Sequence, residues 1–275
     1  MRNALRGVAV LAALAAAAAA PAAADPVDAT FSITINALDG HHQVNGGTSD
    51  RLNFAPLPLG ELVLRSRRES VRIEGLPPVT FGYSGAGDGA DSTRLSIVNA
   101  TLRHGFDGGW FLGAGQTIYN QSTTYTSVQS GYIYTRGDTV IPIVGSEVQF
   151  SRVTGARFEA GRIVERGGNR VEAWLAVNPK MHGVQYTRIP SSTFCSGFGS
   201  GGPTGCGQYA PTFADPENAT QVDATLSFTL RVSKHGDVIY GMRYLNYGAH
   251  YDDIPGQLAD RNVGFAPAFG YRFRF

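Results

Sequence analysis

Histidine and aspartate residues gather at the ends of two segments of the chain, and their types could do chemistry. The first group is Asp39, His41 and His42, and the second is His250, Asp252 and Asp253. An Asp–His pair can polarise a water molecule for hydrolysis, and several imidazoles can bind a metal ion. Neither group has the fixed spacing of a ligand set, so solvated loop residues are the simpler interpretation. We therefore predict no catalytic, metal-binding or cofactor-binding residue.

Other short motifs lie in contexts that do not support their chemistry. Residues 197–202 match G-x-G-x-x-G, but they lie in an irregular stretch rather than between a strand and a helix, so no nucleotide site follows. Asp88 and Asp91 lie in a Gly-rich loop without the number of ligands that Ca²⁺ needs. His104 and His182 have no serine pattern near them that indicates a Ser–His hydrolase.

The chain contains two cysteines, Cys195 and Cys206, close together in a Gly- and Ser-rich stretch. In an oxidising compartment, two nearby thiols most simply close one loop disulfide. A metal site would need further ligands, and no histidine lies near this pair in the sequence. We therefore predict a Cys195–Cys206 disulfide.

The elements that must position these residues are β-strands, because apolar and polar residues alternate with a period of two along much of the chain. Ten strands fit the pattern, although eight or twelve are also compatible with it. Tight turns fall at 67–69, 107–109, 166–169 and 234–237, and longer loops separate the other strands. The ten predicted strands are 27–38, 61–67, 70–83, 92–105, 110–122, 147–164, 170–187, 220–233, 238–250 and the C-terminal segment after 252–261.

The C-terminal segment ends on an aromatic residue and alternates over more than ten positions. Tyr271, Phe273 and Phe275 lie on its apolar face, and Arg272 and Arg274 lie on the other. This segment resembles the C-terminal signature of bacterial outer-membrane β-barrels, whose assembly machinery recognises the last strand and its final Phe. The resemblance implies an all-β, antiparallel up-and-down barrel in the membrane, and it makes these three aromatic residues the assembly signal. Alternating short turns and long loops fit the same architecture.

The N-terminal segment has the features of a secretory signal peptide. Arg2 and Arg6 precede an apolar run from Val8 to Ala20, and small residues lead to Asp25. We expect residues 1–24 to be cleaved and residues 25–275 to form one barrel domain. The protein is then exported, and the outer membrane is its expected location.

In such a barrel, charged residues opposite the lipid-facing side chains point into the lumen. Because an interior of eight to ten strands is narrow, we expect a network of paired charges to fill most of it. The excess of arginine would favour anions if ions pass. The residues expected to form this network are Arg94, Arg157, Glu159, Glu172, Lys180, Asp223, Arg231, Arg243 and Arg272.

These features predict a non-enzymatic envelope protein, either a narrow porin-like channel or a structural, surface-exposed barrel. The alternative is a barrel hydrolase acting on lipid or peptide at the external rim. The His and Asp groups there are similar to those of omptin proteases, but no omptin sequence motif is present. A soluble periplasmic β-protein is a third interpretation. Expected partners are outer-membrane lipid or lipopolysaccharide, the barrel-assembly machinery, and small solutes or ions. The formal net charge of +1 argues against nucleic acid.

Overall fold

The computed structural model describes residues 27–44, 49–52, 55–84, 90–128, 133–136, 139–142, 145–188, 192–199, 202–209, 212–251 and 259–275. The predicted signal peptide, Asp252 and Asp253 lie outside these residues. Among the described residues, no helix is long and apolar enough to cross a membrane.

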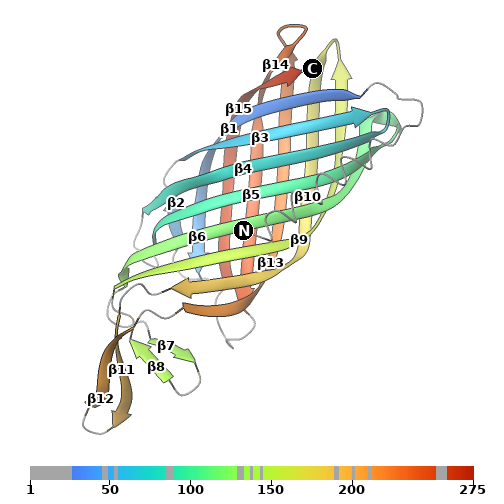
Figure 1. The fold of residues 1–275 in the computed structure, drawn as a ribbon. Helices are drawn as coiled ribbons and strands as arrows, with labels where there is room; N and C mark the ends of the chain where they lie inside the picture. Colours follow the sequence, from blue (N-terminus) through green and yellow to red (C-terminus); the bar gives the residue numbers. More distant parts are fainter. Residues whose placement is uncertain are drawn as a thin grey trace.

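Ten long antiparallel strands form a closed β-barrel, which confirms the predicted fold class (Figure 1). They are β1 (Asp28–Val44), β3 (Ala55–Ser66), β4 (Glu69–Ser84), β5 (Ala90–Gly105), β6 (Trp110–Val128), β9 (Gly145–Arg166), β10 (Asn169–Arg188), β13 (Thr212–Arg231), β14 (Gly236–Tyr251) and β15 (Ala259–Arg274). The first and last strands pair along most of their length, from Thr30 opposite Arg274 to Val44 opposite Asp260. This pairing closes the sheet and leaves no open edge between them.

Shorter elements lie at the end of the barrel that carries the long loops. The β2 strand pairs with β1 and β4, and two separate hairpins project beyond the barrel (Figure 1). These elements are β2 (Ser49–Leu52), β7 (Ile133–Arg136), β8 (Thr139–Pro142), β11 (Ser192–Gly199) and β12 (Gly202–Tyr209). The sequence pattern did not predict them, because four to eight residues carry too few alternations.

The opposite end carries the four tight turns that the sequence predicts. Gly167 and Gly168 form a two-residue turn between β9 and β10 with φ values of 61° and 84°. Two adjacent positive φ angles match the twist of a hairpin and favour glycine at both positions. A short 3₁₀ turn, η1 (Asp107–Gly109), connects β5 to β6. We call this end the short-turn end and the other the long-loop end.

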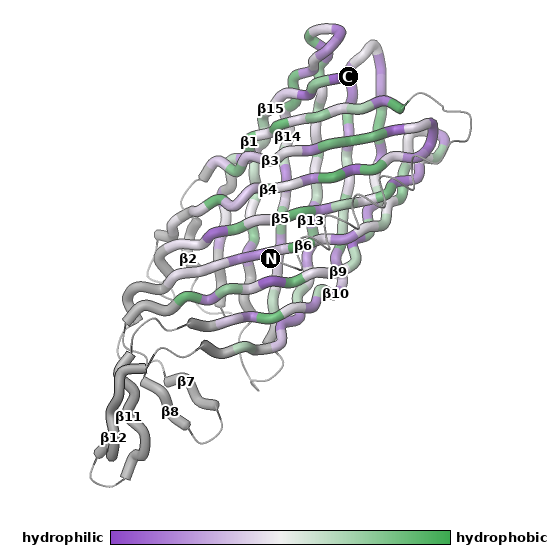
Figure 2. The backbone as a smooth tube through the Cα atoms, viewed as in Figure 1, coloured by the Kyte–Doolittle hydropathy of each residue, from purple (hydrophilic) through white to green (hydrophobic). Residues whose placement is uncertain are grey.

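Buried and exposed residues alternate along the strands, and hydrophilic and hydrophobic residues are interspersed along each strand in Figure 2. The outward face carries a band of exposed apolar side chains, whereas polar and charged residues are buried inside. This arrangement is the reverse of a soluble protein and matches a barrel surrounded by lipid. Members of the outward band include Ile33, Ile35, Leu102, Leu112, Phe158, Leu175, Leu226, Met242, Phe265 and Phe269.

Candidate functional site in the barrel lumen

The lumen near the short-turn end is filled by charged side chains from eight strands. They come from inward positions of β3, β4, β5, β9, β10, β13, β14 and β15 and form one connected set of ion pairs, which we call the charged cluster. Its members are Glu61, Arg72, Glu74, Arg103, Arg157, Glu159, Arg170, Glu172, Asp223, Arg243 and Arg272.

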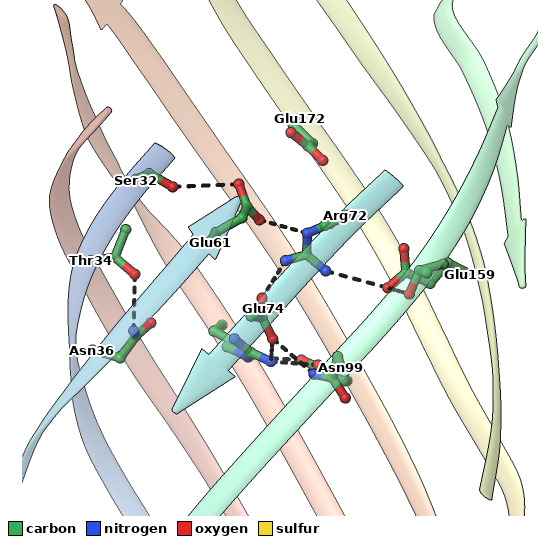
Figure 3. Close-up of polar contacts among 12 residues, drawn as sticks. Ser32, Thr34, Asn36, Glu61, Arg72, Glu74, Asn99, Glu159 and Glu172 are labelled. Atoms are coloured by element: carbon green, nitrogen blue, oxygen red, sulfur yellow. Dashed lines mark hydrogen bonds and ion pairs between the residues drawn. The ribbon is translucent and has the colours of Figure 1, made fainter. Parts of the chain in front are cut away.

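Arg72 connects three carboxylates that come from different strands (Figure 3). Its Nε lies 2.6 Å from Glu61 Oε2, and its Nη1 lies 3.3 Å from Glu159 Oε1. Its Nη2 also donates to Glu74. Glu74 accepts a further hydrogen bond from Asn99 Nδ2 at 2.9 Å. One guanidinium therefore ties β3, β4 and β9 together across the lumen.

Glu159 is the most shared carboxylate of the charged cluster. Besides Arg72, it accepts from Arg103 Nε at 2.7 Å and from Arg157 Nε at 2.8 Å. The side chain of Glu159 is 0% exposed, so these guanidinium groups replace all of its solvation by bulk water. A carboxylate surrounded by three cations can stay ionised in a buried position, because pairing offsets the cost of desolvation.

A second group of contacts extends the charged cluster toward β13 and β14. Arg157 Nη2 lies 3.1 Å from Asp223 Oδ2, and Arg243 contacts both Asp223 oxygens at 2.9 and 2.6 Å. The Arg243 Nη2 atom also lies 2.7 Å from Glu74 Oε1. The guanidinium of Arg243 is thus held by two carboxylates from two different strands, a geometry that suits its fixed fork of donors.

Trp174 lies at the centre of this arrangement and is 5% exposed. The guanidinium carbon of Arg72 lies 4.6 Å from the centroid of its ring, and that of Arg157 lies 5.4 Å away. Gly161 lies directly opposite Trp174 on one side and Phe111 on the other. A Cβ at Gly161 would come within 2.7 Å of both aromatic side chains, so glycine provides the space that they fill.

An apolar layer lies in the lumen next to the charged cluster, on the side of the long-loop end. Tyr119 and Tyr247 stack with ring centroids 3.9 Å apart and planes 7° apart, and each is 1% exposed. Other members of the layer are Leu57, Leu76, Leu95, Ile97, Val153, Met181, Ala219, Ala249 and Ala266. Water would have to displace these contacts to pass.

Polar side chains lie above the tyrosine pair and form a small cup. Glu217 accepts a hydrogen bond from Tyr247 Oη at 2.8 Å and another from Ser151. Gln185 Nε2 donates to Gln149 Oε1 at 2.8 Å. The cavity in the cup measures only about 10 Å³, too little for a solute path.

The charged cluster leaves one larger cavity of about 60 Å³ on the side of β1, β14 and β15. Arg72, Trp174 and Arg272 contribute to its wall. A polar cavity of this size has room for a few water molecules. The cavity lies beside one side of the cluster.

The structure brings together most of the charges that the sequence predicts for the lumen. Six of them lie in the charged cluster: Arg157, Glu159, Glu172, Asp223, Arg243 and Arg272. Arg94, Lys180 and Arg231 are instead exposed. Arg231 has an inward register but lies at the rim, where β13 ends.

Two of these three predictions are corrected for distinct physical reasons. The prediction placed Arg94 in the lumen on the assumption that apolar residues face lipid. Its neighbour Leu95 and the next inward residue Ile97 face the apolar layer of the lumen, so Arg94 points outward. Lys180 lies in a register irregularity between Asn178 and Met181, which shifts the alternation along β10.

Five members of the charged cluster were not predicted: Glu61, Arg72, Glu74, Arg103 and Arg170. The signal was present, because Arg72 and Glu74 alternate with Val71 and Ile73 along β4. Several arginines and prolines in residues 56–78 obscured the alternation there.

In the described part of the chain, the two predicted groups of histidine and aspartate residues do not come together into one site. Asp39 and His41 are exposed on β1, and His250 lies on β14, with β15 between these two strands. His104 Nδ1 lies 2.5 Å from Glu69 Oε1, but this exposed pair lies at the short-turn end. No group of three metal-ligating side chains occurs within the described part of the chain.

Cys195 and Cys206 are directly opposite each other in the β11–β12 register. That register is compatible with the predicted bond, which stays a prediction. Of the expected assembly signal, Phe273 is 42% and Phe275 is 82% exposed, and Tyr271 packs edge-on against Phe273.

No protein-family model and no curated protein matches the chain. Among solved structures, the outer-membrane protease OmpT from Escherichia coli is similar, with a TM-score of 0.50 and 11% identity over 90% of this chain and 97% of that chain. The translocator domain of the autotransporter NalP from Neisseria meningitidis has a TM-score of 0.40 and 9% identity, covering 100% and 96%. The β-domain of the Bordetella autotransporter BrkA has a TM-score of 0.40 and 15% identity, covering 91% and 100%.

The chain thus has the fold of bacterial outer-membrane β-barrels. At 11% identity, the similarity to OmpT concerns the fold alone. The TM-scores of the two autotransporter domains, 0.40 each, are lower still.

Proposed function

We propose that this protein is a non-enzymatic barrel of the bacterial outer membrane whose lumen is closed to solutes, so that it acts as a structural or surface-exposed envelope protein. The short-turn end faces the periplasm in this proposal, and the long loops face outward. The outward apolar band and the C-terminal aromatic strand support the membrane location.

The observation that carries the proposal is the double closure of the lumen. The charged cluster crosses it from eight strands, and the Tyr119–Tyr247 stack closes it again above. A narrow channel, the other form considered from the sequence, would need a continuous polar path past both levels. In the described part of the chain, the cavities at these two levels measure about 60 and 10 Å³, which is too small for such a path.

No hydrolase activity is proposed. An external His–Asp site would need the two loop groups to converge, and the described His104–Glu69 pair lies at the wrong end.

Single-channel conductance of the refolded protein in a planar bilayer tests this proposal. Folding is verified beforehand by heat-modifiable electrophoretic mobility. We expect no discrete current steps from the folded protein. Reproducible steps with a defined conductance would overturn the closed-lumen proposal, and their ion selectivity would then report on the arginine excess.

A further inference from the structure

Arg272 is the least paired arginine of the charged cluster. Its side chain is 7% exposed, and its ion pair in the described part of the chain is long, with Nη2 3.9 Å from Glu61 Oε1. The Arg272 Nε atom is buried, and no described group accepts a hydrogen bond from it. Each of the other five arginines approaches at least one carboxylate oxygen to 2.8 Å or less. Arg272 therefore keeps a buried donor that the protein does not use, and such a donor is costly.

The carboxylates nearest to Arg272 are already held by other arginines. Glu61 accepts from Arg72 Nε at 2.6 Å. Asp237 is directly opposite Arg272 on β14, but Arg274 contacts it at 2.9 and 2.8 Å. The Arg274–Asp237 pair is neutral, so it does not offset the six arginines and five carboxylates of the cluster. The uncompensated charge of +1 therefore lies at Arg272.

The cavity of about 60 Å³ lies against this arginine, and we call it the Arg272 cavity. Part of its wall consists of small residues of β1, β13, β14 and β15, which leave space beside the long side chains of the cluster. These residues are Ser32, Thr34, Thr225, Ser227, Gly241 and Ala268. Thr225 Oγ1 is a second buried polar atom without a hydrogen-bond partner among the described residues. Two unused donors, Arg272 Nε and Thr225 Oγ1, thus belong to residues that line one cavity.

The carboxylates in the wall do not make the Arg272 cavity negative. Glu74 lies 2.7 Å from Arg243, and Glu172 lies 2.9 Å from Arg103 and 2.5 Å from Arg170. Their charges are therefore balanced on the side of the cluster. Water can accept hydrogen bonds from the two unused donors, but it carries no charge and leaves the excess of +1 in place. An anion satisfies the donors and balances the charge.

We propose that the Arg272 cavity binds a small inorganic monoanion of halide size, such as chloride, with Arg272 and Thr225 donating to it. A hydrogen bond from a guanidinium to an anion is charge-assisted and stronger than one between neutral groups. The bound anion brings the net charge of the cluster to zero, where burial makes an unbalanced charge costly. A cavity of about 60 Å³ has room for an ion slightly larger than water, but not for an organic solute.

Quenching of tryptophan fluorescence by iodide tests this site, because Trp174 also lines the Arg272 cavity. The chain contains two tryptophans, so Trp110→Phe leaves Trp174 as the only one. The full chain with this substitution is titrated with iodide in detergent, and sodium gluconate, whose anion is too large for the cavity, keeps the ionic strength constant. We expect quenching that saturates with iodide concentration and that chloride reverses by competition.

Two further variants in the same background separate the anion site from general access to Trp174. Arg272→Gln removes the cation, and its matched control is Arg231→Gln, which removes an exposed arginine at the rim of the short-turn end. Ala268→Leu fills the cavity but keeps Arg272, and its matched control is Ala224→Leu at an outward position of β13. Heat-modifiable electrophoretic mobility verifies the folding of each protein.

Arg272→Gln should weaken iodide binding by about tenfold or more, because it removes a hydrogen bond from a charged group. Ala268→Leu should abolish the saturable quenching, and both controls should stay within about twofold of the parent. Quenching that is absent, linear in iodide, insensitive to chloride or unchanged in Arg272→Gln would overturn the proposal and leave water as the occupant. The proposal goes beyond the closed lumen and does not depend on it, since current steps in a bilayer would overturn the closed lumen and leave the iodide result unchanged.

Discussion

Replacing Glu159 by glutamine should destabilise the barrel more than any exposed charge can. The Glu159 side chain is 0% exposed and contacts Arg72, Arg103 and Arg157. The substitution keeps the shape but removes one negative charge. The charged cluster contains six arginines and five carboxylates, a formal charge of +1, which becomes +2 in the variant.

The magnitude follows from the cost of leaving a buried charge without its partner, about 3–5 kcal/mol. The matched control is Glu165→Gln on the same strand. Glu165 also contacts arginines, at 3.4 and 3.7 Å, but its side chain is 56% exposed. Because water screens such exposed pairs, the control substitution should lower the free energy of unfolding by at most about 1 kcal/mol.

The assay is equilibrium unfolding by urea in lipid vesicles, followed by tryptophan fluorescence, with the free energy of unfolding taken by linear extrapolation. Adding Arg157→Met to Glu159→Gln returns the cluster to a charge of +1. The double variant should then lose less stability than the sum of the two single changes, by about 0.5–3 kcal/mol. The reasoning is refuted if the unfolding free energies of the Glu159→Gln and Glu165→Gln variants differ by less than about 1 kcal/mol.

Three further predictions concern packing, the loops and assembly. Gly161→Val should lower the unfolding free energy by about 1–3 kcal/mol, because its side chain would collide with Phe111 and Trp174, whereas the outward control Ala160→Val should be nearly neutral in the same urea assay. Cys195 and Cys206 should not react with a thiol reagent in protein purified without reductant; two titratable thiols would disprove the disulfide. Deleting Phe275 should reduce the amount of barrel at the cell surface while leaving the urea midpoint of refolded protein unchanged, and normal surface levels would contradict an assembly role.

The fold could be predicted from the sequence because lipid and lumen impose opposite requirements on alternate residues of every strand. Along β15, Phe265 and Phe269 are exposed, whereas Ala266 and Arg272 are buried. That pattern extends over the whole strand, so small errors at its ends do not change the interpretation. Long strands and glycine-containing turns were therefore predictable.

The lumen was less predictable, because its composition changes with depth. Near the short-turn end, inward residues are charged, and the rule that apolar residues face lipid holds. At the level of Tyr119 and Tyr247, the lumen itself is apolar, and the same rule assigns Arg94 to the wrong side. Sequence alternation gives two faces but does not say which one is inside when both are mixed.

The charged cluster raises the question of why the lumen near the short-turn end is charged rather than apolar. Buried ion pairs are often no more stabilising than well-packed apolar residues of similar volume, so stability alone does not favour arginine and glutamate here. An apolar lumen would, however, make both faces of every strand apolar. A shift of one residue in register then costs little, and the unfolded chain becomes prone to aggregation before it reaches the membrane.

Charges inside the barrel remove that ambiguity. A shift of β9 by one residue would turn Arg157 and Glu159 toward lipid and bring Phe158 into the lumen. An arginine that faces lipid near the midplane costs about 2–4 kcal/mol, and a carboxylate costs less. Shared carboxylates such as Glu159 extend this requirement to several strands at once, since each arginine finds its partner only when the other strands are also in register. We therefore expect the charged cluster to specify the register of the barrel with the same side chains that fill the lumen near the short-turn end.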